Sequence, residues 1–252
     1  MRVLASLLRL KVTLGYFALA LTATALLSHL RPHTQWHVLF EASTNLHNLG
    51  DGHVGTLVAS AFLTDGETDW LWLGSVAVLF AVAEWLSGST RFLSTFVAGH
   101  VGATALVALG LFVGIRADWL ADSLAVAVDV GVSYAAAAVA GSMIRYLGGP
   151  WRTTWACGWV SLVAASVVTD PSFTAFGHAA ALSIGLALGA FYLRRDGKPL
   201  IDNRSRTVMA EPVQPSASMT SLCHRRTYAC RTSDRDHEWI TVESGRYRES
   251  AR

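Results

Sequence analysis

The segment Asp129-Val-Gly-Val-Ser-Tyr-Ala-Ala-Ala-Ala-Val-Ala-Gly141 places one hydroxyl group inside a run of small, apolar residues. That hydroxyl belongs to Ser133, and Gly131 lies two residues before it. A membrane helix can hold a serine without any chemical role, because the hydroxyl can bond the carbonyl oxygen four residues earlier. A catalytic role would need a base elsewhere in the chain at a comparable depth, so the topology of the whole chain decides how this segment is interpreted.

The 252-residue chain has the composition of a membrane protein with several spans. Hydrophobic residues make up 52% and charged residues only 15%, against about 25% charged residues in soluble domains. From Arg194 onward lie 12 of the 20 Lys and Arg residues and 8 of the 18 acids. The sequence therefore predicts an all-α membrane domain over residues 1–195 and a polar tail over residues 196–252, and it excludes a soluble enzyme.

Six apolar runs are long enough to be read as transmembrane helices that form one bundle. We expect the spans at about residues 12–30, 70–86, 92–115, 130–144, 153–169 and 171–193, with a long outer loop at 31–69. The first run lacks a small-residue cleavage site after it and is interpreted as an uncleaved span rather than a signal peptide. The tail has little apolar periodicity, which favours a disordered cytoplasmic segment.

The Lys and Arg residues next to the spans predict the orientation of the bundle. With the N-terminus inside, only Arg31 and Arg116 flank the spans on the outer side. The inner flanks hold nine basic residues: Arg2, Arg9, Lys11, Arg91, Arg145, Arg152, Arg194, Arg195 and Lys198. Nine basic residues on the inner flanks against two on the outer flanks favour cytoplasmic termini. In this orientation both Ser133 and His178 follow outer turns.

His178 is the candidate base for Ser133. It lies eight residues beyond Asp170, about 12 Å below the outer surface if the segment is helical. Ionisable groups in a membrane usually face a partner or a water-filled cavity, and a serine hydroxyl beside an imidazole can perform acyl transfer. Asp129 and Asp170 could orient a histidine, but at outer loops we expect both to be solvated.

Small residues on both helices would let the fourth and sixth spans approach closely. They recur at helical spacing: Gly131, Ala135, Ala138 and Gly141 on the fourth span, and Ala181, Gly185 and Gly189 on the sixth. Such faces are common in membrane bundles. They gain weight here because one helix carries a serine and the other a histidine at similar depth.

Three short motifs, taken together, resemble the rhomboid family of intramembrane serine proteases in a divergent bacterial branch. Gly131-Val132-Ser133, followed by Gly141, is similar to the family's G-x-S motif. The stretch from His178 to Gly185 resembles the family motif on the last core span, and Glu84-Trp-Leu-Ser-Gly88 resembles the E-x-x-x-G turn after the second span. The resemblance covers about residues 10–195.

The resemblance implies a six-helix rhomboid-like bundle and an endopeptidase that cleaves transmembrane protein substrates. Ser133 would be the nucleophile and His178 the general base, with Gly131, Gly141 and Gly185 supporting the oxyanion site and the helix packing. The implied partners are substrates and the lipid bilayer, and the implied location is a bacterial inner or plasma membrane. No cofactor, metal or nucleic acid is expected.

Two departures from the family pattern leave a second interpretation open. Tyr134 follows the serine where the family usually has Gly or Ala, and residues around Thr68 to Gly74 contain neither the His nor the Asn that help to bind the oxyanion. His100 on the third span is another possible polar group, although its predicted depth argues against direct contact. The alternative is a catalytically inactive rhomboid-like protein that binds membrane partners.

The remaining histidines and cysteines give no strong metal pattern. In the tail, Cys223, His224, Cys230 and His237 do not have the spacing of a zinc finger, and we interpret them as ordinary tail residues. The predicted outer loop carries four histidines without tight ligand spacing: His33, His37, His47 and His53. We interpret these four as residues of the membrane interface.

Overall fold

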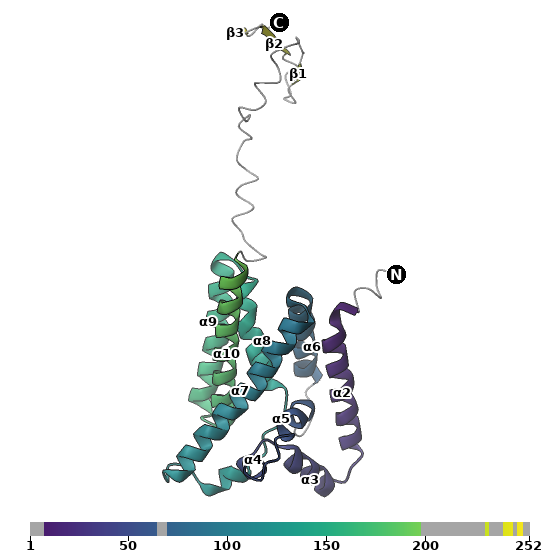
Figure 1. Cartoon of the computed structure of the whole chain (residues 1–252), viewed down its shortest axis with the longest axis vertical. Helices are drawn as coiled ribbons and strands as arrows, with labels where there is room; N and C mark the ends of the chain where they lie inside the picture. Colours follow the sequence, from purple (N-terminus) through teal and green to yellow (C-terminus); the bar gives the residue numbers. More distant parts are fainter. Residues whose placement is uncertain (1–7, 65–69, 198–229, 232–238, 244–245, 249–252) are drawn as a thin grey trace. The chain divides into compact units, whose positions relative to one another are not determined.

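The computed structural model describes residues 8–64 and 70–197, and in the tail the backbone of 230–231, 239–243 and 246–248 (Figure 1). The chain divides into two compact units, Met1–Asn203 and Arg204–Arg252, which are considered separately. The first unit is a helical bundle and contains all the candidate site residues.

Six helices of the described residues lie at the positions of the predicted spans: α2 (Lys11–Ser28), α6 (Trp70–Ser87), α7 (Ser89–Arg116), α8 (Ser133–Ser142), α9 (Gly149–Thr169) and α10 (Phe173–Asp196). Four of these, α2, α6, α7 and α10, are long and apolar enough to cross a membrane, by length and composition alone. The number of six spans stays a prediction, because α8 and α9 are not among the four.

The expected outer loop 31–69 is largely helical where the structure describes it. Its elements are α3 (Pro32–Ala42), α4 (Leu46–Gly50), α5 (Thr56–Ala59) and the 3-10 helix η2 (Ser60–Phe62). They gather at the end of the bundle opposite the start of α2 (Figure 1). The described residues of this unit also contain the 3-10 helices η1 (Leu8–Leu10), η3 (Asp122–Val126) and η4 (Met143–Arg145).

The predicted fourth span at 130–144 is shorter than expected. The helix α8 begins only at Ser133 and has ten residues, a rise of about 15 Å against a hydrocarbon core of about 30 Å. The residues before it are not helical, because Gly131 has a φ of +123°, which a residue with a side chain rarely adopts. Ser133 therefore stands at the first residue of its helix.

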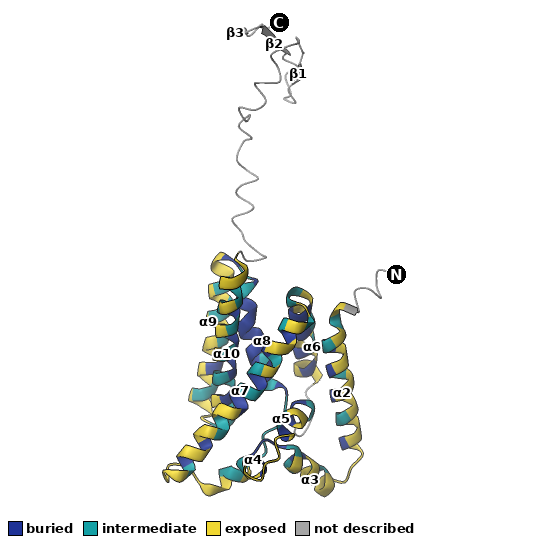
Figure 2. Cartoon of the chain, viewed as in Figure 1, coloured by how far each residue is buried: buried dark blue, intermediate teal, exposed yellow. Residues whose placement is uncertain are grey.

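Helix α8 forms the centre of the bundle. Eight of its ten residues are buried, and it lies between α7 and α10 as the dark segment inside the bundle (Figure 2). Glycines make this close approach possible. A Cβ on Gly99 of α7 would lie 2.1 Å from the Ala138 Cβ, and one on Gly185 of α10 would lie 2.0 Å from the Ala138 carbonyl oxygen. The small residues that predicted contact between the fourth and sixth segments are thus at the helix crossing.

Glu84 joins three helices at the predicted inner end. Its carboxylate accepts hydrogen bonds from the N–H groups of Val12 (3.1 Å) and Thr13 (2.8 Å) and from the Ser89 hydroxyl (2.6 Å). The first two N–H groups belong to the first turn of α2, where they have no partner within the helix. The third bond fixes the turn at Gly88, where φ is +77°. Glu84 is only 1% exposed.

Glu84→Ala is expected to lower the free energy of unfolding in detergent by about 2–4 kcal/mol, because it leaves buried donors without an acceptor. Glu84→Gln should cost less, since one acceptor oxygen remains. Thermal unfolding followed by circular dichroism measures the effect, and Glu41→Ala, at an exposed glutamate of α3, is the control. Equal unfolding temperatures for Glu84→Ala and Glu41→Ala would refute this role.

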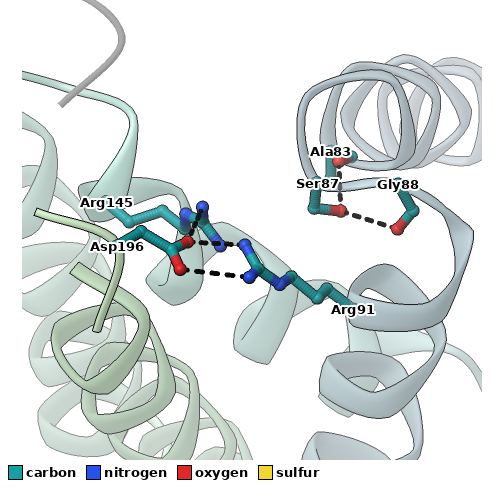
Figure 3. Close-up of polar contacts among 6 residues, drawn as sticks. All are labelled: Ala83, Ser87, Gly88, Arg91, Arg145 and Asp196. Atoms are coloured by element: carbon teal, nitrogen blue, oxygen red, sulfur yellow. Dashed lines mark hydrogen bonds and ion pairs between the residues drawn. The ribbon is translucent and has the colours of Figure 1, made fainter. Parts of the chain in front are cut away.

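An ion-pair cluster ties α10 to two other elements at the same end of the bundle (Figure 3). The Asp196 carboxylate accepts from Arg91 at the start of α7 in a two-point contact (2.5 and 3.1 Å) and from Arg145 of η4 at 2.6 Å. Both guanidinium groups also lie 5.5 Å from the ring centre of Tyr192. Two-point Arg–carboxylate contacts are stronger than single ones, so the cluster fixes the end of α10 against the residues that follow α8.

The predicted disordered tail contains three short strands where the structure describes it: β1 (Cys230–Arg231), β2 (Trp239–Glu243) and β3 (Arg246–Arg248). They pair antiparallel in the order β1-β2-β3, with Cys230 opposite Ile240 and Val242 opposite Tyr247. The tail differs from the prediction at these strands, and its other residues after 197 lie outside the described residues.

Candidate functional site

Ser133 and His178 line the same cavity. Ser133 is the first residue of α8 and His178 lies in the second turn of α10, and each is partly buried. The cavity has a volume of about 620 Å³ and is bounded by α6, α8, α9 and α10. Most of its walls are apolar, with Leu79, Trp155, Trp159, Ala136 and Ala137 among them. The structure thus places the two predicted site residues, which are 45 positions apart, at one surface.

No hydrogen bond of ordinary geometry joins Ser133 to His178 among the bonds of the described residues. In structures without substrate, a nucleophile and its base are often farther apart than in the reacting complex. The observed arrangement brings both groups to the cavity but leaves their direct contact as a prediction.

The position of Ser133 at the start of α8 has a chemical consequence. The first N–H groups of an α-helix have no partner within the helix, and this end of the helix carries a partial positive charge. The Ser133 N–H is one of these groups. It can therefore donate to a negative oxygen that forms next to the Ser133 hydroxyl in the cavity.

The backbone before Ser133 is held by the outer segment. The Gly131 N–H donates to the Ser60 carbonyl oxygen at 2.8 Å. The Ala61 carbonyl oxygen accepts from the Tyr16 hydroxyl at 2.6 Å, which fixes η2 to α2. Gly131 thus supports the site in two ways: it accommodates a left-handed turn, and its N–H anchors that turn to Ser60. Gly141 and Gly185 have a different role, because they lie where α8 packs against α10. A Cβ on Gly141 would lie 2.8 Å from the Leu182 carbonyl oxygen.

His100 supports the same segment and is not a lining residue of the cavity. It is 4% exposed on α7, and its Nε2 atom lies 3.2 Å from the Ser60 hydroxyl oxygen. Because the Ser60 carbonyl oxygen accepts from the Gly131 N–H, His100 acts on the site through η2. This is in line with its predicted depth, which argued against direct contact with the reacting groups.

Tyr134 packs directly on the candidate base. Its ring and the His178 ring meet edge to face, with centroids 5.3 Å apart and an interplanar angle of 78°. Gly177, the residue before His178, leaves room for this contact, because a Cβ at Gly177 would lie 2.3 Å from the Tyr134 Cζ. The sequence presented Tyr134 only as a departure from the family pattern, and its contact with His178 is a residue role that the sequence reasoning missed.

Asp129 is partly buried rather than solvated, in contrast to the expectation from its place in an outer loop. Its N–H donates to the Ser43 hydroxyl at 2.7 Å, and its carbonyl oxygen accepts from the Thr44 N–H at 3.2 Å. Burial raises the pKa of the Asp129 carboxyl from 3.8 to about 6, and the neighbouring Tyr134 side chain partly offsets this. Asp170, by contrast, is exposed as expected.

The raised pKa of Asp129 predicts how stability depends on pH. The folded protein holds the proton of the Asp129 carboxyl more tightly than the unfolded chain does. The stabilisation that this proton gives to the folded state is therefore fully present below about pH 4 and is lost as the pH rises to about 6. After discounting for partial exposure, we expect Asp129 to remove about 1–2 kcal/mol from the free energy of unfolding over this range. The difference between the unfolding temperatures of Asp129→Asn and the unmodified protein measures it.

Asp129→Asn should unfold at a higher temperature than the unmodified protein at pH 7, and the two should converge toward pH 4. The control is Asp122→Asn, because Asp122 is exposed in η3 and its substitution should leave the pH dependence unchanged. A constant difference between Asp129→Asn and the unmodified protein from pH 4 to pH 7 would contradict this assignment.

The described residues contain no group of three or more His, Cys, Asp or Glu side chains that could hold a metal ion. Among the loop histidines, the rings of His33 and His37 are in contact, with centroids 4.5 Å apart. Of the tail residues considered for zinc, Cys223, His224 and His237 lie outside the described residues.

Comparison with known families assigns most of the chain to one family. A family profile described as rhomboid-like protein matches residues 10–198, which is three quarters of the 252 residues. Comparison with curated proteins and with solved structures finds no match. The match extends from the start of α2 to the end of α10 and contains every candidate site residue. The chain therefore belongs to the rhomboid-like family of integral membrane proteins.

Proposed function

We propose that this protein is an intramembrane serine endopeptidase that cleaves transmembrane protein substrates with Ser133 as nucleophile and His178 as general base. The observation that carries the proposal is the shared cavity. A serine at a helix N-terminus and a histidine from a second helix line one apolar cavity of about 620 Å³. Apolar cavities with a few polar groups are the usual sites of ligand binding and catalysis.

The reaction follows from the chemistry of these groups. The Ser133 hydroxyl oxygen attacks the peptide carbonyl carbon while its proton passes to the His178 imidazole. The carbonyl oxygen becomes negative and accepts a hydrogen bond from the Ser133 N–H at the start of α8. The C–N bond then breaks, and His178 gives the proton to the leaving amine. Water, deprotonated by His178, hydrolyses the ester and restores both residues.

The walls of the cavity support a substrate that is itself in the membrane. Two of the four bounding helices, α6 and α9, contribute exposed apolar side chains beside it, among them Val78, Val82 and Leu162. An apolar substrate segment that unwinds locally could place its backbone between these helices. In the proposed orientation both termini are cytoplasmic and the protein lies in a bacterial inner or plasma membrane, with the cavity toward the outer side.

The second candidate is a catalytically inactive rhomboid-like protein that binds membrane partners. Two observations favour it. Ser133 and His178 have no direct hydrogen bond within the described part of the chain, and the stretch Thr68–Gly74 has neither His nor Asn. A missing oxyanion donor can cost a factor of about 10²–10³ in rate. The Ser133 N–H at the helix start partly replaces such a donor, and we therefore place the protease first.

Labelling with a serine-directed fluorophosphonate in detergent separates the two candidates. The protease predicts that the unmodified protein is labelled and that Ser133→Ala is not. The binding protein predicts no labelling of the unmodified protein, together with unchanged co-purification of a membrane partner by Ser133→Ala. Labelling that persists in Ser133→Ala would exclude Ser133 as the nucleophile.

A further inference from the structure

We infer that the cavity beside Ser133 and His178 is a site for one fatty acyl chain of about 12 carbons, with the carbonyl end of the chain at Ser133. Acyl esters are then a second class of substrate for this pair. The cleavage step rests on the proposed function, since it uses the same nucleophile and base. The site for the chain rests on the length, volume and lining of the cavity alone.

The first observation is that the two ends of the cavity differ. Ser133 at the start of α8 and His178 in the second turn of α10 lie at one end. Trp155 marks the other end, because its indole N–H donates to the Ala140 carbonyl oxygen at 2.8 Å. Ala140 lies seven residues beyond Ser133, which is about 10 Å along the helix. The reactive groups thus stand at one end of an apolar cavity, as a chain with one polar end requires.

The second observation is the length of the cavity along the helices. Its lining residues run from Ser133 to Met143 on α8 and η4, from Trp72 to Val82 on α6 and from Trp155 to Ser166 on α9. Ten residues of helix rise about 15 Å. A carbon–carbon bond of about 1.5 Å advances an extended chain by about 1.3 Å, so about 12 carbons cover this length.

The third observation is that the volume agrees with the length. The cavity holds about 620 Å³. A methylene group takes roughly the space of a water molecule, about 30 Å³, so a chain of about 12 carbons fills about 360 Å³ and leaves room at Ser133 for the ester group. A transmembrane helix is about 10–12 Å wide and would need more than about 1,000 Å³ over the same length. The inner part of the cavity therefore fits one acyl chain and not a substrate helix.

The lining favours a neutral ester over a charged head group. No Lys, Arg, Asp or Glu is among the described residues that line the cavity. A buried charge without a partner is costly, so a free carboxylate or a phosphate is disfavoured there. An ester carbonyl is neutral and needs only a hydrogen-bond donor, which the Ser133 N–H at the start of α8 supplies.

The apolar side chains of a protein substrate are the plain alternative occupants. One side chain next to a scissile bond would fill only the part of the cavity near Ser133. The part beside Trp155 and Met143 would remain empty, whereas occupied protein interiors leave few voids larger than a water molecule. A chain that continues along α8 fills both parts.

The cleavage of an acyl ester uses the groups of the proposed protease. The Ser133 hydroxyl oxygen bonds to the ester carbonyl carbon, and the His178 imidazole takes the hydroxyl proton. The C–O bond to the alcohol breaks, and His178 gives this proton to the alcohol oxygen. Water then attacks the acyl-serine and loses a proton to His178, which returns it to the Ser133 oxygen. The products are a carboxylic acid and an alcohol.

The kinetic test compares para-nitrophenyl dodecanoate with para-nitrophenyl butanoate in a steroid detergent, which has no alkyl chain to compete. The dodecanoate should have a kcat/KM at least about tenfold higher, and Ser133→Ala should hydrolyse neither ester. Ala136→Phe should bring the ratio of the two values toward one, because the new ring stands one helical turn from Ser133 and closes the rest of the cavity. Ala164→Phe, at an exposed position of α9 outside the lining, is the matched control.

A binding test needs no catalysis and decides the matter even if Ala136→Phe does not fold. Methyl 12-bromododecanoate carries bromine, a quencher of tryptophan fluorescence, at the end of its chain. Added to Ser133→Ala, it should quench saturably and be displaced by methyl dodecanoate. The quenching should fall by at least about half in Trp155→Phe, because Trp155 lines the inner end of the cavity. Trp119→Phe is the control, since Trp119 is 79% exposed and lies outside the lining.

The outcomes separate this inference from the proposed function. Equal kcat/KM for the two esters, or quenching that does not saturate, would overturn the acyl-chain site. Reporter cleavage without hydrolysis of the dodecanoate ester would overturn acyl esters as a substrate class and leave the protease in place. If quenching saturates but neither the ester nor a transmembrane reporter is cleaved, the proposed function fails and the acyl-chain site stands.

Discussion

Replacing either Ser133 or His178 by alanine is expected to abolish proteolysis, lowering the cleavage rate of a transmembrane reporter by at least about 10³-fold. The two side chains line one cavity, and no other histidine of the described residues lines it. Without Ser133 there is no nucleophile for the acyl-enzyme, and without His178 the serine hydroxyl keeps its proton. Reporter cleavage followed by gel electrophoresis measures the loss.

The cavity offers a matched control for the nucleophile. Ser166 of α9 lines the same cavity, so Ser166→Ala removes a similar hydroxyl in a similar environment and should retain activity within about threefold. Because the nucleophile and base act as a unit, Ser133→Ala combined with His178→Ala should be no worse than either alone. A loss in Ser166→Ala as large as that in Ser133→Ala would point to a different nucleophile.

The largest effect on stability is expected for Gly185→Ala, which should lower the free energy of unfolding by about 3 kcal/mol or more. A Cβ at this position would lie 2.0 Å from the Ala138 carbonyl oxygen and 2.7 Å from its Cα. These are backbone atoms of α8, so no side chain can turn away to make room. To accept the methyl group, α10 must move away from α8, and it would carry His178 away from Ser133.

Gly158→Ala on α9 provides the contrast, because a Cβ there meets no atom within 4 Å. In a helix this substitution should be neutral or should stabilise by up to about 1 kcal/mol. Thermal unfolding in the same detergent compares the two variants. If Gly185→Ala unfolds at the same temperature as Gly158→Ala, the close packing of α8 against α10 is not required.

Much of the bundle could be predicted from the sequence, because the long apolar segments report directly on the membrane. The first, second, third and sixth predicted spans correspond to α2, α6, α7 and α10, which are long and apolar enough to cross. The glycines of the fourth and sixth segments also indicated the contact of α8 with α10. Apolar spans and faces of small residues are both patterns among residues near one another in sequence. The hydrophobicity and size of the side chains are therefore enough to predict them.

Other features could not be predicted, because they depend on bonds between distant segments. The helix α8 begins at Ser133 since Gly131 turns left-handed and its N–H is bonded to Ser60, and nothing in the apolar pattern of 130–144 marks this. Likewise, the burial of Asp129 follows from its bonds to Ser43 and Thr44, which are more than 80 residues away.

The sequence by itself determined that this is a membrane protein of the rhomboid-like family, with a serine on one apolar segment and a histidine on another, because composition and motif order are local properties. The tertiary structure decided what surrounds the two. It placed both at one cavity, assigned His100 to the support of η2, and put Tyr134 against His178. The physical reason is that packing between helices joins residues whose distance along the chain carries no information about their contact.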